Sequence, residues 1–332
     1  MFGFIVRRMM SSLVVILLAT MAVFALFFLG PSNPAQPICD ANGRCTPERL
    51  ANIERGLGLD QPVHEAYVEF MDGVFTGREI SFGAEVYDCD APCLGISYSN
   101  RLQVTDELEK RLPATIMIAV GGSITYVILG VVIGVLAAAR RGTFFDRALV
   151  SGSLLVSSVP YYLMCLLAWI FLTLQSSIFP ATGYFPVTEN PWETFKGLLL
   201  PCLVLGVASA PAYARFTRGQ MVETLGDDYI RTASAKGLSG RVVVFKHALR
   251  AAIVPIVTIF GLDFGVLLGG TIFTEEIFGI DGIGRWGLDA VLAPVDLPVL
   301  TATIMVGAIF IVFSNLIVDL LYGVLDPRVR VG

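Results

Sequence analysis

The chain has 332 residues, of which 55% are hydrophobic and 15% are charged, and its formal net charge is −5. Its mean hydropathy of +0.72 is too high for a soluble domain of this size, which excludes an ordinary soluble enzyme. The basic residues form short clusters beside hydrophobic runs, so nothing in the sequence indicates a nucleic-acid partner.

The first predicted element is an apolar run over residues 9–30, which follows Arg7 and Arg8. Its 22 residues are enough to cross a bilayer as a helix. A charged start before an apolar run also fits a signal peptide, but this run is long and no A-x-A-like cleavage site follows it. We therefore predict an uncleaved first span with the two arginines in the cytoplasm.

Residues 31–112 are polar, acidic and rich in glycine and proline, and they contain four cysteines. If Arg7 and Arg8 are cytoplasmic, this segment is an extracytoplasmic insert, where disulfides persist. Four cysteines allow three pairings, and the spacing favours Cys39–Cys45 with Cys89–Cys93. A C-x3-C spacing without a nearby histidine is a poor zinc pattern, so we expect no metal site.

Five further apolar runs follow, and Pro160 should kink the second of them; they cover residues 113–139, 149–174, 198–214, 251–273 and 298–324. Six spans place both termini on one side of the membrane. The segments assigned to the cytoplasm carry 14 Lys and Arg against 5 Asp and Glu, and the outer segments carry 9 against 21. This asymmetry predicts that both termini are cytoplasmic.

The predicted fold class is therefore an all-α membrane protein of six transmembrane helices with a small insert between the first two. Its parts would be the first span (1–30), the insert (31–112), a five-helix permease core (113–325) and a cytoplasmic tail (326–332). The core would include a polar cytoplasmic loop over residues 220–250.

A polar, basic island at residues 221–255 separates two of the spans. It has the pattern of a helix, a break and a second helix, because Gly237 suits a left-handed helix end and Ser239 suits the next N-cap. Two interpretations fit these residues. The island is either a solvated loop that orients the protein in the membrane or a docking element for a cytoplasmic partner.

The sequence lacks the motifs of the common hydrolytic sites. It contains no G-x4-G-K-[ST] phosphate loop, no H-E-x-x-H zinc motif and no G-x-S-x-G nucleophile elbow. The run from Gly237 to Gly240 looks like the serine motif of rhomboid proteases, but it lies in the polar island. His64 and His247 both lie outside the predicted spans, so we expect no enzymatic activity.

The fifth apolar run has glycine at every fourth position, namely Gly261, Gly265 and Gly269, a spacing that lets helices approach closely. Asp263 lies among them, near mid-span, where a carboxylate is costly and usually faces a partner or a water-filled path. We expect Asp263, Gly265 and Gly269 to line a translocation path. The alternative is that Asp263 is a hydrogen-bonded packing residue. For Asp319, a structural pairing with a basic loop is expected.

The island resembles the EAA loop of the inner-membrane subunits of bacterial ABC importers, and most closely that of the dipeptide/oligopeptide (and nickel) permease family. The residues that carry this resemblance are Tyr229–Ser239 (YIRTASAKGLS), His247–Arg250 and Ile253–Pro255. Arg231-Thr232-Ala233 replaces the usual opening of the loop, and Arg250 stands where a proline is usual. Both departures are typical of the peptide branch.

The resemblance extends over nearly the whole chain. Other matching segments are residues 5–35, 56–62, 109–115, 276–284 and 326–328. Two features depart from the family pattern: an insertion at residues 84–95, which contains Cys89 and Cys93, and the charge at Asp263. They bear on the choice of solute rather than on the family.

The resemblance implies a permease subunit of an ATP-driven, binding-protein-dependent importer of di- or oligopeptides in the bacterial inner membrane. The implied partners are a homologous permease subunit, two cytoplasmic ATPase subunits, an extracytoplasmic solute-binding protein and lipid, with no cofactor. Coupling to the ATPases is expected at Asp227, Asp228, Tyr229, Arg231, Thr232, Ala233, Lys236, Gly237 and Leu238. Two rivals are a self-sufficient channel or ion-coupled carrier using Asp263, and a membrane-anchored enzyme or adhesion module in residues 31–112.

Overall fold

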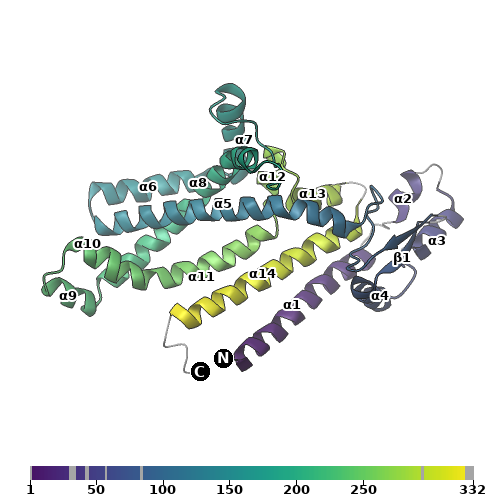
Figure 1. Cartoon of the computed structure of the whole chain (residues 1–332), viewed down its shortest axis with the longest axis horizontal. Helices are drawn as coiled ribbons and strands as arrows, with labels where there is room; N and C mark the ends of the chain where they lie inside the picture. The colour runs from purple at the N-terminus through teal and green to yellow at the C-terminus, as the bar shows by residue number, and fades with distance from the viewer. Residues whose placement is uncertain are drawn as a thin grey trace. The chain divides into compact units, whose positions relative to one another are not determined.

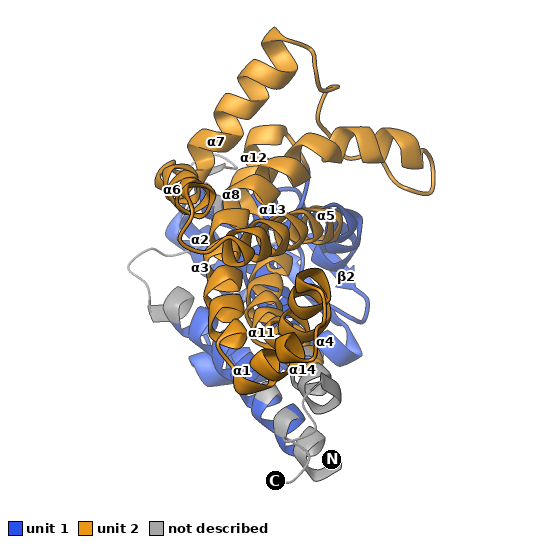
Figure 2. Cartoon of the chain, turned by 90° about the vertical axis from the view of Figure 1, so that its left-hand side faces the viewer, with its two compact units in different colours: residues 1–115, 281–312 blue, residues 116–280, 313–332 orange. Residues whose placement is uncertain are grey.

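A computed structural model of the chain describes residues 2–29, 35–41, 45–56, 58–82, 85–292 and 295–325. It contains two compact units: Met1–Thr115 with Asp281–Val312, and Ile116–Ile280 with Phe313–Gly332 (Figure 2). The two longest apolar helices at the unit boundaries, α5 and α14, contribute residues to both. The predicted tail at 326–332 and the side chain of Asp319 lie outside the described residues.

Unit 1 contains the first helix, the insert and a return segment from near the C-terminus (Figure 1). Its elements are α1 (Phe2–Leu29), α2 (Ala35–Ala41), α3 (Pro47–Gly56), α4 (Val63–Thr76), β1 (Arg78–Phe82), β2 (Glu85–Cys89), α13 (Ile283–Leu292), the start of α5 (Val104–Ala139) and most of α14 (Leu297–Leu325). The insert is thus made of short elements, each too small to bury a core by itself.

The strands β1 and β2 form an antiparallel pair with Arg78 opposite Cys89 and Phe82 opposite Glu85. The prediction of an all-α protein is therefore wrong in this segment. Both strands carry β-branched or aromatic residues, and Phe82 and Tyr87 lie edge to face with ring centroids 5.7 Å apart. These rings pack onto a small cluster formed by Cys89, Cys93 and Ile96. The hairpin is thus stabilised by side-chain packing on one face.

The helix α5 begins at Val104, nine residues before the apolar run predicted at 113–139. The additional turns are charged, and Glu107 near the helix start accepts from Lys110 at 2.9 Å and also pairs with Arg111. These i,i+3 and i,i+4 pairs and an acidic residue near the N-terminus favour helix. The span therefore extends into what the hydrophobicity pattern assigns to the insert.

The regular elements of unit 2 are all helices in its described residues. Its elements are the rest of α5, then α6 (Phe144–Ser158), α7 (Tyr161–Ala168), the π-helical turns η1 (Trp169–Gln175), α8 (Pro191–Leu225), α9 (Asp228–Ala235), α10 (Gly240–Val242), η2 (Val243–Ala248), α11 (Leu249–Leu268), α12 (Ile272–Phe278) and the end of α14. Two apolar clusters join α5 to α8 and to α11.

Four helical segments are long and apolar enough to cross a membrane: Val104–Ala139, Pro191–Leu225, Gly240–Leu268 and Leu297–Ile317. A fifth candidate is the helix pair Phe144–Ser158 and Tyr161–Gln175. The two helices meet at an angle of 89°, and Pro160 lies in the break between them. The predicted kink is thus a sharp break. In α1, the apolar stretch among the described residues is the shorter Met9–Ala25.

Candidate functional site

The polar island forms the short helix α9, which ends before Gly237 in the left-handed conformation with φ +79°. The amide of Gly237 donates to the carbonyl of Ser234 at 3.0 Å, which closes the last turn. A Cβ at position 237 would meet no atom within 4 Å. The requirement for glycine is therefore conformational rather than steric, and the predicted helix end is confirmed.

One face of α9 is packed against unit 2 itself. Ile230 and Ala233, one turn apart, are buried. Ile230 belongs to an apolar cluster that also contains Met221 of α8 and Val135 of α5. The side chain of Ala233, one of the expected coupling residues, therefore faces the interior of unit 2. Ser234 and Ala235 are exposed.

The opposite face of α9 is exposed and mixes charge with apolar area. Its members are Asp227, Asp228, Tyr229, Arg231, Thr232, Lys236, Gly237 and Leu238, and we call them the α9 surface. Tyr229 is 46% exposed and Leu238 is 41% exposed. Large apolar side chains left in solvent beside charged ones are typical of a docking surface.

The exposed apolar area continues beyond the residues that the sequence pattern identifies. Val242 is 37% exposed and Phe245 is 58% exposed, on the helical turns after Gly240. Sequence reasoning missed both because they stand in an apolar run, VVVF, that suggests burial. Of these four residues the structure buries only Val243. A helix that packs on one side cannot bury four consecutive residues, because their side chains point in different directions around it.

The charged side chains of the α9 surface form one weak ion pair among the described residues. Arg231 lies 3.4 Å from Asp228, and both side chains are exposed, so the pair contributes little to stability. Partial burial raises the pKa of Tyr229, and the charge of Asp227 acts in the same direction. The hydroxyl of Tyr229 therefore stays protonated and available as a hydrogen-bond donor at neutral pH.

An ion pair between a half-buried arginine and a buried aspartate lies at the same end of unit 2. Arg218 of α8 donates from Nε and Nη2 to the two carboxylate oxygens of Asp146 at 2.6 and 2.7 Å. The amide of Gly142 also donates to Asp146, at 2.9 Å. This two-pronged geometry joins the first turn of α6 to α8. The sequence shows both residues only as isolated charges, because they are far apart along the chain.

Asp263 lies on an uncovered face of α11. Its carboxylate accepts a hydrogen bond from the hydroxyl of Tyr213 at 2.8 Å. The ring of Tyr213 in turn lies against that of Tyr126, with centroids 4.6 Å apart. Asp263 is exposed, together with Leu262 and Val266 on the adjacent helix surface. The carboxylate is thus oriented by one hydrogen bond and is open on its other side.

The structure does not bring Gly265 and Gly269 to the same side as Asp263. Gly265 is buried and lies about 200° around the helix from Asp263, since each residue advances about 100°. Gly269 is the C-cap of α11. On the buried side, the hydroxyl of Ser314 in α14 donates to the carbonyl of Gly261 at 2.5 Å. Gly261 therefore contacts α14, whereas Asp263 lies on the exposed side of α11.

The insert contains the two disulfides that the cysteine spacing favours. Cys39 is joined to Cys45 and Cys89 to Cys93, with S–S distances of 1.98 and 2.03 Å. Among the residues that the structure describes, no group of three or more His, Cys, Asp or Glu side chains is placed to hold a metal ion. The cysteines of the insert therefore act as crosslinks.

Comparison with protein families gives two matches that together cover almost the entire chain. Residues 1–119 match the N-terminal part of binding-protein-dependent transport system membrane components. Residues 130–331 match the binding-protein-dependent transport system inner membrane component. The second match contains the α9 surface and Asp263, and the first contains the whole insert.

Individual proteins agree with the family matches. The chain is 36% identical to a probable peptide ABC transporter permease protein of Sinorhizobium fredii, over 98% of this chain and 99% of that protein. It is 35% identical to the dipeptide transport system permease protein DppB of Escherichia coli, over 99% of each. Among solved structures, an inward-facing MetNI methionine ABC transporter chain has a similar fold, with a TM-score of 0.55 and 16% identity over 67% of this chain and 97% of that chain.

Proposed function

The chain belongs to the family of binding-protein-dependent transport system inner membrane components, and from this membership we propose that it is the permease subunit of an ATP-driven importer of di- or oligopeptides. The observation that carries the proposal is full-length similarity to permease proteins of peptide and dipeptide transport systems. The apolar helices of the chain fit a multi-pass protein of the inner membrane.

The proposed topology has six spans with both termini in the cytoplasm and the insert outside. It is supported by the charge asymmetry, with 14 basic against 5 acidic residues in the segments assigned to the cytoplasm. An impermeant thiol reagent, added to intact cells after mild reduction, should label the cysteines at 39, 45, 89 and 93. Labelling that requires cell lysis would contradict this orientation.

The proposed assembly contains a second, homologous permease subunit, two cytoplasmic ATPase subunits and an extracytoplasmic binding protein. The family description itself names a binding protein. The chain has no phosphate-binding loop, so the energy of ATP hydrolysis has to reach it through a protein contact. We assign no catalytic step to this chain. Its contribution is a change between outward and inward openings of the path.

The α9 surface is the proposed contact with an ATPase subunit. Its inner face is fixed by Ile230 and Ala233, so that a push on the helix moves the ends of α5 and α8 with it. Its outer face offers Tyr229 and Leu238 as apolar contacts inside a charged rim. A short helix that is anchored on one side and exposed on the other can transmit a displacement without unfolding.

Replacing Gly237 by valine tests the coupling proposal. A β-branched residue at φ +79° is strongly disfavoured, so the last turn of α9 should rearrange and solute-stimulated ATP hydrolysis should fall at least several-fold. Gly240→Val is the matched control, because a Cβ there also meets no atom within 4 Å and its φ is not positive. If Gly237→Val retains wild-type uptake and hydrolysis, the α9 surface is not the coupling element.

Asp263 is proposed to line the translocation path. An exposed carboxylate on a helix that is apolar enough to span the membrane needs water or a polar partner beside it. The hydrogen bond from Tyr213 fixes the carboxylate without covering it. A carboxylate in this setting would attract the ammonium group of a peptide.

The isosteric change Asp263→Asn should lower dipeptide uptake several-fold while assembly with the partner subunits survives, because it removes the charge and keeps the shape. Tyr213→Phe should have a smaller effect in the same direction. Uptake by Asp263→Asn that equals wild type across pH would identify a packing residue instead. Uptake that persists without any ATPase subunit would favour an ion-coupled carrier.

A further inference from the structure

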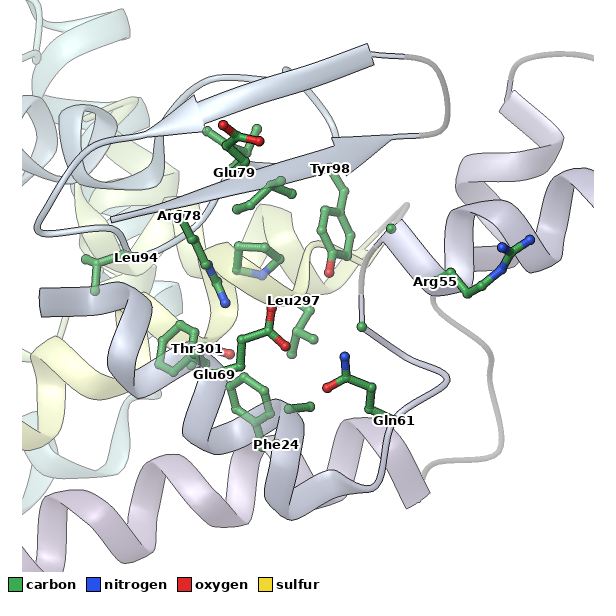
Figure 3. A pocket seen from close by; sticks show the side chains of 17 residues that line it. Phe24, Arg55, Gln61, Glu69, Arg78, Glu79, Leu94, Tyr98, Leu297 and Thr301 are labelled. Atoms are coloured by element: carbon green, nitrogen blue, oxygen red, sulfur yellow. The ribbon is translucent and has the colours of Figure 1, made fainter. Parts of the chain in front are cut away.

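Unit 1 contains a polar cavity that the transport proposal does not use (Figure 3). Its volume is ≈ 110 Å³, several times the roughly 10–15 Å³ that one water molecule requires. The walls come from α1, α3, α4, β1, the segment between β2 and α5, and the start of α14, all within this unit. Polar side chains from separate elements converge on the cavity, as Figure 3 shows for Arg78, Glu69 and Tyr98.

Arg78 is held at the cavity by its packing. Its guanidinium carbon lies 5.3 Å from the ring centroid of Phe70. Gly73 leaves room for its stem, since a Cβ there would come within 2.6 Å of the Arg78 Cδ. The Nε atom is buried and has no hydrogen-bond partner among the described residues. Burial lowers the pKa of Arg78 from its usual range, and the guanidinium remains charged.

Thr301 provides a second buried polar group on the same cavity. It is 1% exposed, and its hydroxyl has no hydrogen-bond partner in the described part of the chain. Two buried polar groups without partners, from β1 and from α14, are unusual in a native protein and costly when nothing fills the space between them. A ligand with two acceptor oxygens would satisfy both, and a carboxylate suits the fork of an arginine.

The residues at the mouth of the cavity favour a carboxylate that belongs to a molecule with a positive group. Glu69 and Gln61 line it and are exposed, and Figure 3 shows both directed toward the same space as Arg78. The insert at residues 31–112 carries 14 acidic against 7 basic residues, which would repel a simple anion. A molecule that carries an ammonium group near its carboxylate would instead pair with Glu69.

We propose that this cavity is a binding site for the carboxylate and ammonium groups of a small zwitterion, either a free amino acid or a dipeptide, each of which carries both groups. The carboxylate lies on Arg78 and Thr301, and the ammonium lies toward Glu69. The site lies wholly within unit 1, and the inference does not depend on the transport proposal.

The test measures equilibrium binding of radiolabelled L-alanine to the full chain in lipid nanodiscs. Binding should weaken about tenfold or more in Arg78→Met, which keeps the stem on Phe70 and removes the charge-assisted hydrogen bonds. Thr301→Val and Glu69→Gln should each weaken it less. Arg55→Met is the matched control, because Arg55 also lines the cavity yet its guanidinium donates to Ala51 and Asn52 of its own helix.

Unlabelled competitors identify the source of the groups. Alaninamide, which lacks the carboxylate, should not compete, and N-acetylalanine, which lacks the ammonium, should compete weakly. Competition by alanylalanine as strong as by alanine assigns the site to dipeptides as well as amino acids, and its absence assigns it to free amino acids. The inference is overturned if neither alanine nor alanylalanine binds, which would leave a water-filled cavity. It is also overturned if Arg78→Met and Arg55→Met bind alanine equally and Thr301→Val, a milder change, binds it as wild type does.

Discussion

The insert and the α9 surface are both built from short elements, but they are held in place by different means. In the insert, two disulfides close loops with sequence separations of 6 and 4, and small apolar clusters surround the bonded cysteines. The helix α9 has no crosslink and is fixed by Ile230, Ala233 and the left-handed turn at Gly237. Short elements cannot bury enough apolar area to be stable alone.

The difference teaches how each region can be used. The crosslinked insert packs against α1 and α14, and together they enclose a polar cavity in which groups such as Arg78 are left to bind a ligand. An element docked on long helices moves when they move, so its free face suits the transmission of force. The charged groups differ in the same way. Arg78 of the insert has a buried Nε atom without a partner among the described residues, whereas Asp146 and Arg218 of unit 2 pair with each other.

The largest effect is expected from breaking the ion pair. Arg218→Met leaves the 4%-exposed Asp146 side chain without its partner, which should lower the free energy of unfolding of unit 2 by about 3 kcal/mol. Hydrogen exchange should accelerate at the start of α6 and leave the insert unchanged. Arg215→Met is the control, since Arg215 is half-buried like Arg218 but donates to the neutral hydroxyl of Ser157, at 3.1 Å.

A second substitution separates loss of the pair from loss of packing. Adding Asp146→Asn to Arg218→Met removes the unpaired buried charge and should recover part of the stability, as seen in a higher melting temperature than that of the single variant. A double variant less stable than Arg218→Met would mean that Asp146 acts mainly through its bond from Gly142.

Removing the disulfide that closes the shorter loop should give the next largest effect, which is expected in the insert. The double change Cys89→Ser and Cys93→Ser releases a loop of sequence separation 4, which costs about 2 kcal/mol in the chain-entropy account. Amide exchange should rise in β1 and β2 while α9 keeps its protection, because α9 has no crosslink to lose. Equal changes in both regions would show that the insert and α9 are stabilised together.

The smallest structural effect is expected on the exposed face of α9. Arg231→Glu removes a weak surface pair with Asp228, so the melting temperature should change by less than the equivalent of about 0.5 kcal/mol. Solute-stimulated ATP hydrolysis should nevertheless fall about two- to five-fold, because the reversed charge stands on the proposed contact. Arg241→Glu, an exposed arginine outside α9, is the control; equal losses in the two variants would point to net charge rather than to this surface.

Much of the fold follows from patterns that are local in the sequence. Apolar runs predict the long helices, and Gly237 predicts the end of α9 because only a residue without a side chain adopts positive φ at little cost. The close spacing of the cysteines favours the pairing that the structure contains. The helix boundaries are less accurate, as at Val104, because charged residues extend a helix beyond its apolar part.

The sequence by itself determined the family, the apolar helices, the crosslinks and the helix–glycine–helix form of the island. Only the tertiary structure decided that Ala233 faces inward, that Asp263 is separated from Gly265, and that Arg218 holds Asp146. It also decided that Arg78 and Thr301 lie on one cavity. The physical reason is that hydrophobic runs, capping and short loops depend on neighbouring residues, whereas pairings between distant residues depend on which helices pack together and in what rotation.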